Sequence, residues 1–176
     1  AALATSARVP ISAAQAPRAT IASVSTRWTP KMRTSLLAPA LLLLALSAQA
    51  QSDPALAAAA KEPGAVVKPS GLVFLSQREG TGANPGATDT VKVNYRGTFP
   101  DGREFDSSYK RGEAIEFPLD GVIKCWTEGV QLMKVGGKAR FTCPSAIAYG
   151  SRGAGNVVPP NATLVFEVEL LGIKGK

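Results

Sequence analysis

The sequence contains two cysteines, whose side chains could form a covalent bond with each other. Cys125 and Cys143 both lie in the C-terminal part of the chain, and the sequence contains no histidine. An even number of cysteines in an oxidising compartment permits a disulfide. The bridge would close a loop of about 18 residues and stabilise the folded state by roughly 3 kcal/mol. Two unpaired, buried thiols are the alternative, and the spacing alone leaves both open.

Apolar and aromatic side chains form a second group, whose spacing predicts a helix. One stripe recurs at intervals of three, four and three positions: Ile123, Trp126, Val130 and Met133. Such intervals place side chains on one face of a helix. Residues 148–160 are instead rich in Gly and Pro, and they carry aromatic and aliphatic side chains outside any regular element. On pattern alone, Trp126 and Phe166 are core residues rather than parts of a binding site.

Alternation of apolar and polar residues predicts the strands that must position these side chains. The clearest case is residues 89–98, whose apolar members are Val91, Val93 and Tyr95. A strand with one buried face has this pattern. Asp101-Gly102 supplies a tight turn into the next strand, so we expect a hairpin there. Further strands are expected over residues 72–77, 138–143 and 164–171. The predicted fold is α+β, with a twisted antiparallel sheet of about five strands around one short helix.

The charge of the chain is concentrated in its N-terminal part. Residues 1–50 contain 5 of the 20 basic residues and no acidic one, so the remainder has 15 basic and 13 acidic residues, a net charge of +2. A nearly neutral folded part gives no electrostatic reason to expect nucleic-acid binding.

The N-terminal part also predicts the organisation of the chain. Residues 32–50 have the parts of a secretory signal peptide, with a basic start, an apolar run of about a dozen residues and small residues at its end. This run is too short for a spanning helix, so we expect no stable membrane span after processing. Residues 1–31 are expected to be a leader or transit-like extension. Residues 51–70 are predicted to be a flexible linker, with a frayed short helix around residues 54–61 as the alternative. The folded domain is expected over residues 71–176.

Four segments of the expected domain carry specific motifs in a fixed order. They are VKVNYRGTFPDGREFDSS, GVIKCWTEGVQLMKVGGKAR, AYG at residues 148–150 and VVPPNATLVFEVELL. Together they resemble the FKBP-type peptidyl-prolyl cis-trans isomerases, and the similarity covers residues 71–174. The resemblance implies a twisted antiparallel sheet wrapped around one short helix, with the substrate proline held between helix and sheet.

The resemblance also assigns candidate site residues by matched motif. The candidates for catalysis are Tyr95, Asp106, Tyr149 and Phe166. The candidates for substrate binding are Phe105, Arg111, Ile115, Val122, Ile123, Trp126, Val157 and Val158. Trp126 would form the floor of the site. Without the resemblance, Phe105-Asp106 would be an edge hydrophobe followed by a turn-stabilising aspartate. Ala154 stands where family members often carry His, which would alter the rim of the site.

The activity that the resemblance implies is rotation about X-Pro peptide bonds, which requires no nucleophile, cofactor or metal. The uncatalysed step takes tens to hundreds of seconds, so a protein that accelerates it would assist the folding of exported proteins. The expected partners are proline-containing unfolded or nascent exported proteins, and macrolides of the FK506 or rapamycin type. We expect the periplasm or secretion, with the thylakoid lumen as the alternative. A binding module that recognises Pro-containing segments with little turnover is the competing function.

Overall fold

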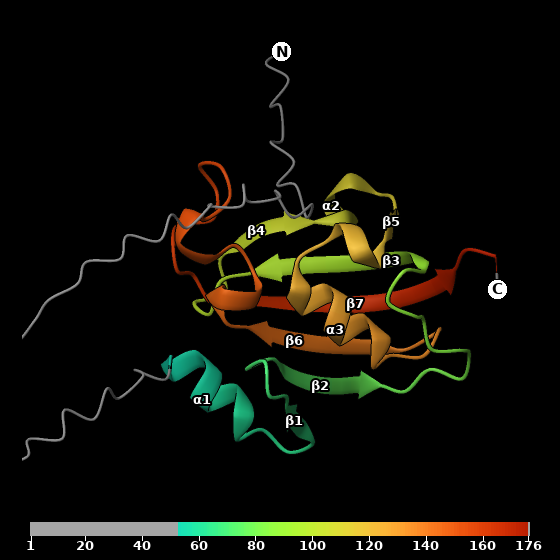
Figure 1. The fold of residues 1–176 in the computed structure, drawn as a ribbon, viewed down its shortest axis with the longest axis horizontal. Coiled ribbons are helices and arrows are strands. Elements are labelled where there is room, and N and C mark those ends of the chain that lie inside the picture. Colours follow the sequence, from blue (N-terminus) through green and yellow to red (C-terminus); the bar gives the residue numbers. More distant parts are fainter. Residues whose placement is uncertain (1–52, 176) are drawn as a thin grey trace, which may run out of the picture. The chain divides into compact units, whose positions relative to one another are not determined.

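Strand β3 (Thr90–Thr98) organises the sheet, because it pairs with three other strands. The computed structural model describes residues 53–175. Figure 1 shows β3 beside β7, with β4 and β6 on their outer sides. Val91, Val93 and Tyr95 are buried, whereas Lys92 and Arg96, at the alternate positions, are exposed. The predicted alternation is therefore confirmed, and it gives the sheet an inner, apolar face and an outer, polar face.

The sheet has seven strands among the described residues, two more than the sequence predicted. Besides β3 they are β1 (Ala65–Val67), β2 (Val73–Arg78), β4 (Glu104–Ser107), β5 (Ile115–Pro118), β6 (Lys138–Cys143) and β7 (Leu164–Ile173). Their order is β1-β2-β6-β7-β3-β4, and β5 also pairs with β3; all these pairs are antiparallel. The additional strands, β1 and β5, have three and four residues, which is too short for a visible alternation.

Helices occupy three places in the described chain. They are α1 (Pro54–Ala60), α2 (Ser108–Arg111) and α3 (Lys124–Gln131), with 3-10 turns η1 (Leu119–Gly121), η2 (Ser145–Ile147) and η3 (Gly150–Arg152). Helix α3 lies against the inner face of the sheet. The apolar stripe predicted for it is buried along its whole length. The predicted helix and its packing are thus confirmed.

Helix α2 interrupts the edge of the sheet beside β3. Strand β4 pairs with the end of β3 at Arg96–Thr98, and β5 pairs with its beginning at Thr90–Val93. Between them, α2 ends at Gly112, whose φ of +72° is a conformation that residues with a side chain rarely adopt. The interruption places the end of α2 next to β3 and β4, where several candidate site residues lie.

The structure differs from the prediction of a flexible linker over residues 51–70. From Asp53 onward this segment forms α1 and β1, which agrees with the alternative of a short helix. Asp53 caps α1 by accepting a hydrogen bond from the backbone N–H of Ala55 at 2.9 Å, and Pro54 follows in the first turn. Two contacts then fasten the segment to the sheet: Arg140 pairs with Glu62, and Thr163 donates a hydrogen bond to Asp53.

A cavity of about 320 Å³ lies between α1 and the outer face of the sheet. Its walls include Ala55, Ala58 and Ala59 from α1, and Arg96 and Thr142 from the strands. Arg96 follows Tyr95 in β3, and Thr142 lies between Phe141 and Cys143 in β6. Because Tyr95, Phe141 and Cys143 contact α3, the alternation along the strands places α1 and α3 on opposite faces of the sheet. The short alanine side chains leave the space under α1 incompletely filled.

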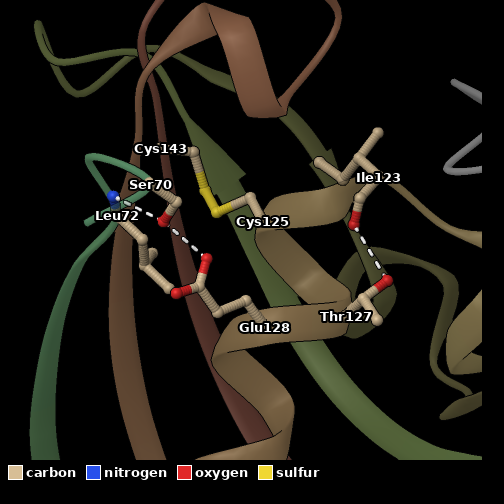
Figure 2. The surroundings of a disulfide bond; sticks show 7 residues. All are labelled: Ser70, Leu72, Ile123, Cys125, Thr127, Glu128 and Cys143. Carbon is tan, nitrogen blue, oxygen red and sulfur yellow. Dashed lines mark hydrogen bonds between the residues drawn. A yellow bond between two sulfur atoms is a disulfide. The ribbon is translucent and has the colours of Figure 1, made fainter. Parts of the chain in front are cut away.

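The two cysteines form a disulfide, which confirms the predicted bridge and excludes the free thiols. The bond links the first turn of α3, at Cys125, to the end of β6, at Cys143 (Figure 2). The two Cα atoms are 6.0 Å apart, and both residues are fully buried. The bridge therefore ties the helix directly to a central strand.

The predictions of a leader and a signal peptide concern residues 1–50, which lie outside the described residues. Within residues 53–175, no helix has both the length and the apolar character needed to cross a membrane.

Replacing Arg140 by Gln tests how α1 is held. The substitution removes the ion pair with Glu62, so we expect faster amide hydrogen exchange in residues 54–67. The free energy of unfolding should change by no more than about 1 kcal/mol, because partly exposed ion pairs contribute little. Lys138→Gln is the matched control, since Lys138 lies on the same strand and pairs with Glu167. Unchanged exchange in α1 of the Arg140 variant would contradict this account.

Candidate active site

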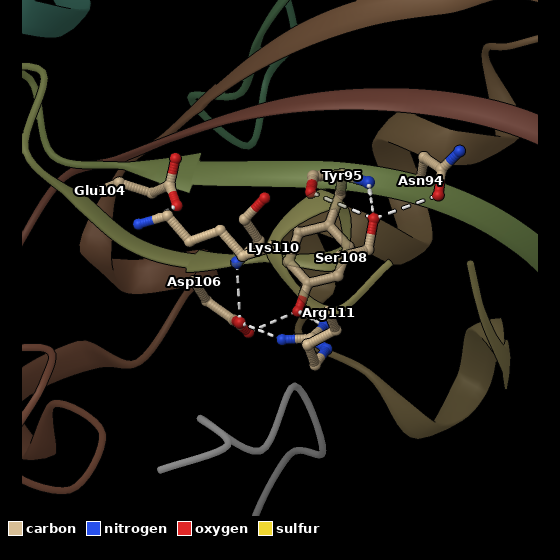
Figure 3. A network of polar contacts seen from close by, with 8 residues as sticks. Asn94, Tyr95, Glu104, Asp106, Ser108, Lys110 and Arg111 are labelled. Atoms are coloured by element: carbon tan, nitrogen blue, oxygen red, sulfur yellow. Dashed lines mark hydrogen bonds and ion pairs between the residues drawn. The ribbon is translucent and has the colours of Figure 1, made fainter. Parts of the chain in front are cut away.

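Three polar side chains from β3, β4 and α2 form a closed network (Figure 3). The hydroxyl of Tyr95 donates a hydrogen bond to one carboxylate oxygen of Asp106. Arg111 donates to the other carboxylate oxygen from Nη1 at 2.5 Å, and to the Tyr95 hydroxyl from Nη2 at 2.9 Å. The side chain of Asp106 is 9% exposed and that of Arg111 is 20% exposed. The carboxylate is thus largely withdrawn from water and bonded to two side chains.

The residues that follow Asp106 hold this network in place. The backbone N–H of Ser107 donates to the Asp106 carboxylate at 2.8 Å. The fully buried hydroxyl of Ser108 accepts a hydrogen bond from the backbone N–H of Tyr95 at 2.9 Å. Ser108 therefore fastens the start of α2 to β3, and Arg111 is presented from the end of the same helical turn.

Burial and charge determine the protonation of the site. Burial, together with the hydrogen bond donated to Asp106, raises the pKa of Tyr95 well above its ordinary value. Burial likewise raises the pKa of Tyr149 to about 12, and the nearby negative charge of Asp106 adds to the effect. Burial opposes the charge of Arg111, but hydrogen bonds to Tyr95 and Asp106 outweigh it and raise the pKa of the guanidinium. At neutral pH both phenols therefore remain protonated donors.

Trp126 lies beside the network at the centre of an aromatic cluster. Its ring meets Tyr95, Phe166 and Phe117 edge-to-face, with centroid distances of 5.2, 5.4 and 5.3 Å. The residue is fully buried, and its indole Nε1 has no hydrogen-bond partner among the described residues. Ring contacts, which favour this perpendicular geometry, therefore fix the indole.

The cluster continues toward β4 through Phe105. Its ring packs perpendicular to that of Phe166 at 5.7 Å and also meets Phe99 at 5.2 Å. This arrangement depends on Gly97 in β3. A Cβ atom at this position would lie 2.7 Å from Phe105 and 3.2 Å from Phe166, closer than ordinary contacts.

The remaining candidates lie around the cluster with different exposures. Val122 and Ile123 are buried where η1 meets α3. Ile123 is the N-cap residue of α3, and its backbone N–H has no partner within the helix. Ile115, Tyr149 and Val157 are half-buried and pack against the core.

The loop after Tyr149 is closed by backbone hydrogen bonds between Ala154 and Val158. They run from Ala154 N–H to Val158 at 2.9 Å, and from Val158 N–H to Ala154 at 3.0 Å. Both side chains are buried. Position 154 therefore carries a small side chain that packs inward.

The structure adds three residues that sequence reasoning did not select. Phe117 and Phe99 extend the aromatic cluster, and Ser108 fixes the backbone of Tyr95. Phe117 lies on the same half-buried face of β5 as Ile115, two positions away. That spacing, in a strand of only four residues, was the signal that could have identified it. Ser108 stands in the EFDSS motif, but its contact becomes evident only when α2 meets β3.

Adding a methyl group to Gly97 tests the packing of the cluster. We expect Gly97→Ala to destabilise the fold by about 1–3 kcal/mol, because the rings of Phe105 and Phe166 must move. Gly172→Ala is the control, since a Cβ there meets nothing within 4 Å. Denaturant titration measures both, and equal stability of the two variants would refute the close packing.

Raising the pH tests the burial of Tyr149. The folded pKa of about 12 exceeds that of an unfolded tyrosine, about 10. The stabilisation that the protonated Tyr149 contributes is therefore fully present below pH 10 and is lost progressively as the pH rises toward 12. Between pH 9 and pH 11 we expect the wild type to lose about 1 kcal/mol more than Tyr149→Phe. Urea titrations at both pH values measure the difference, and parallel losses would contradict the assignment.

Comparison with known proteins places this geometry in a family. A family model described as FKBP-type peptidyl-prolyl cis-trans isomerase matches residues 82–171. The FKBP-type peptidyl-prolyl cis-trans isomerase FkpA of Aeromonas hydrophila is 54% identical over 130 residues, which are 74% of this chain and 48% of that protein. The chain thus spans about half the length of the curated relatives that it matches.

Solved structures agree with the observed fold. The crystal structure of FkpA from Escherichia coli has a TM-score of 0.65 and 49% identity, and the match covers 68% of this chain and 55% of that one. A peptidyl-prolyl cis-trans isomerase from Pseudomonas syringae pv. tomato has a TM-score of 0.64 and 38% identity, covering 68% and 88%. The predicted fold class is confirmed, and the chain belongs to the FKBP-type peptidyl-prolyl cis-trans isomerase family.

Proposed function

We propose that this chain accelerates the cis/trans interconversion of X-Pro peptide bonds in other proteins. The observation that carries the proposal is the contact of the Tyr95–Asp106–Arg111 network with the aromatic cluster around Trp126. Apolar, aromatic rings suit contact with the ring of a proline, and an adjoining polar network suits the amide that must rotate. Membership of the family supports the same conclusion.

The aromatic part would lower the barrier by removing the amide from water. That barrier, about 18–20 kcal/mol, reflects the lost resonance of the planar peptide bond. The twisted amide is less dipolar than the planar one and loses less when it leaves water. Trp126 as the floor, with Phe105 and Phe166 as neighbours, would hold the proline ring by apolar and aromatic contact.

The polar part would orient the peptide and stabilise the rotated amide. Tyr149 and the backbone N–H of Ile123 are donors for peptide carbonyl groups, and the raised pKa of Tyr149 keeps its proton in place. Asp106, oriented by Tyr95 and Arg111, supplies a fixed negative charge beside the reacting carbonyl. Dipoles and charges that are already oriented need no reorganisation as the bond rotates.

For Arg111 we propose a role in addition to substrate binding. Its guanidinium is held by Asp106 and Tyr95, so we propose that it acts mainly by positioning these two residues. Ile115, Val122, Val157 and Val158 would form the apolar walls. No cofactor or metal is needed for a rotation about a single peptide bond.

A binding module with little turnover is the competing function, and it would retain the fold. The structure brings Tyr95, Asp106, Trp126 and Phe166 into one connected set of contacts. A module that only binds proline segments would not need the oriented carboxylate. This feature favours the enzyme.

We further propose that the substrates are proline-containing unfolded or nascent exported proteins, and that macrolides of the FK506 or rapamycin type compete for the same site. The disulfide supports a location in an oxidising compartment, because such bonds are rare in reducing ones. The periplasm or the medium is favoured, with the thylakoid lumen as the alternative.

A protease-coupled assay with a Leu-Pro tetrapeptide tests the activity. We expect a rate above the uncatalysed background that rises in proportion to protein concentration. Asp106→Asn removes the charge with little change of shape, and Asp106→Leu removes both. Each should lower kcat/KM by about tenfold or more, equivalent to about 1.4 kcal/mol in the barrier.

Asp101→Asn is the matched control, because it removes a carboxylate charge from an exposed turn and should leave the rate unchanged. Equal rates for the Asp106 and Asp101 variants would show that the carboxylate has no part in the reaction. A wild type without activity that still binds the peptide would establish the binding module instead.

A further inference from the structure

The disulfide lies at the point where α3 contributes to the candidate site. Cys125 is immediately followed by Trp126 and stands two positions after Ile123. Its partner, Cys143, ends β6, two positions after Phe141, whose ring meets Trp126 at 6.5 Å. The bond therefore links the start of α3, where the candidate site residues Ile123 and Trp126 lie, to the end of β6.

Two further side chains of α3, Thr127 and Glu128, bond to other parts of the domain; Figure 2 shows the contact of Glu128 with Ser70. Thr127 donates a hydrogen bond at 2.6 Å to the carbonyl of Leu119, so it joins the helix to η1 and not to the sheet. Ser70 donates to Glu128 at 2.5 Å, and this contact is exposed to water. The disulfide is thus the covalent attachment of the first turn to the sheet.

A helix of this length needs such support. Helix α3 has eight residues, fewer than an isolated helix requires for stability in water. The indole of Trp126 has no hydrogen bond to hold it, as described above. The position of its ring therefore depends on its contacts with the neighbouring rings and on where the backbone at Cys125 and Trp126 places it against them.

We propose that the Cys125–Cys143 disulfide is a positioning element of the proline site. By holding the first turn of α3 against β6, it keeps the Trp126 ring and the Ile123 N–H in the arrangement that receives the substrate. Without the bond the domain still folds, but this turn becomes mobile and substrate binding must reorder it. The proposal rests on the proposed isomerase function for its effect on substrate, but not for its effect on Trp126.

The test uses the full chain with Trp28 replaced by Phe, so that Trp126 is its remaining tryptophan. The variant Cys125→Ala with Cys143→Ala is compared with the parent and with Leu170→Ala. Leu170 is fully buried in β7 and accepts a hydrogen bond from Gly136 beyond the C-terminal end of α3. We expect its truncation to lower the melting temperature while leaving the disulfide intact, so that it controls for lost stability alone.

Four quantities are measured well below the melting temperature: acrylamide quenching of Trp126 fluorescence, Kd for a Leu-Pro tetrapeptide, KM and kcat. For the double Cys variant we expect stronger quenching, with Kd and KM raised by about tenfold and a smaller change in kcat. The Leu170 variant should keep the parental values of all four.

The outcomes separate this proposal from the proposed function. Unchanged quenching and Kd in the double Cys variant, together with a lowered melting temperature, would overturn the proposal and leave the disulfide a stabilising bond only. If the parent shows neither binding nor turnover, the function fails, while quenching still decides whether the bond positions Trp126. If the double variant does not fold, the parent is compared before and after reduction of the bond to two thiols by dithiothreitol, with thiol titration as the check. Unchanged quenching after complete reduction would then overturn the proposal.

Discussion

The contact of one helix residue with the inner face of the sheet is the constraint on which the site depends. Trp126 is fully buried and meets rings from β3, β5, β6 and β7, so a single side chain joins α3 to four strands. Aromatic rings in edge-to-face contact have limited freedom, because their quadrupoles favour that angle. The same ring would be the floor of the proline site. If Trp126 is that floor, a change that loosens the packing of the core also alters the geometry of the proposed site.

The regular elements could be predicted where a period extends over enough residues. The alternation around Val91, Val93 and Tyr95 and the helix stripe around Trp126 both correspond to buried faces in the structure. Strand β1 could not be predicted, because its three residues become a strand only by pairing with β2. The same holds for the segment that begins at Asp53, which looks like a linker in composition. Its order comes from contacts with Arg140 and Thr163, far away in the sequence.

The candidate site illustrates a different limit. Motif resemblance identified Tyr95, Asp106 and Arg111, but only the fold reveals that Arg111 bonds to both of the others. Pattern alone would have left Trp126 in the core, and it is indeed a core residue. Ser108 escaped notice because a serine after a strand usually caps or turns the chain, whereas here its hydroxyl bonds across to the backbone of β3.

The short strands at both edges of the sheet have a consequence for behaviour at high concentration. Strand β1 forms one edge with only three residues, and Lys68 and Pro69 follow it. On the other side β4 and β5 have four residues each and are separated by α2. Long, flat edges offer unpaired N–H and C=O groups to passing chains and so template aggregation. The described domain, which we propose binds unfolded chains, therefore offers them only short strand edges with which to form intermolecular β-structure.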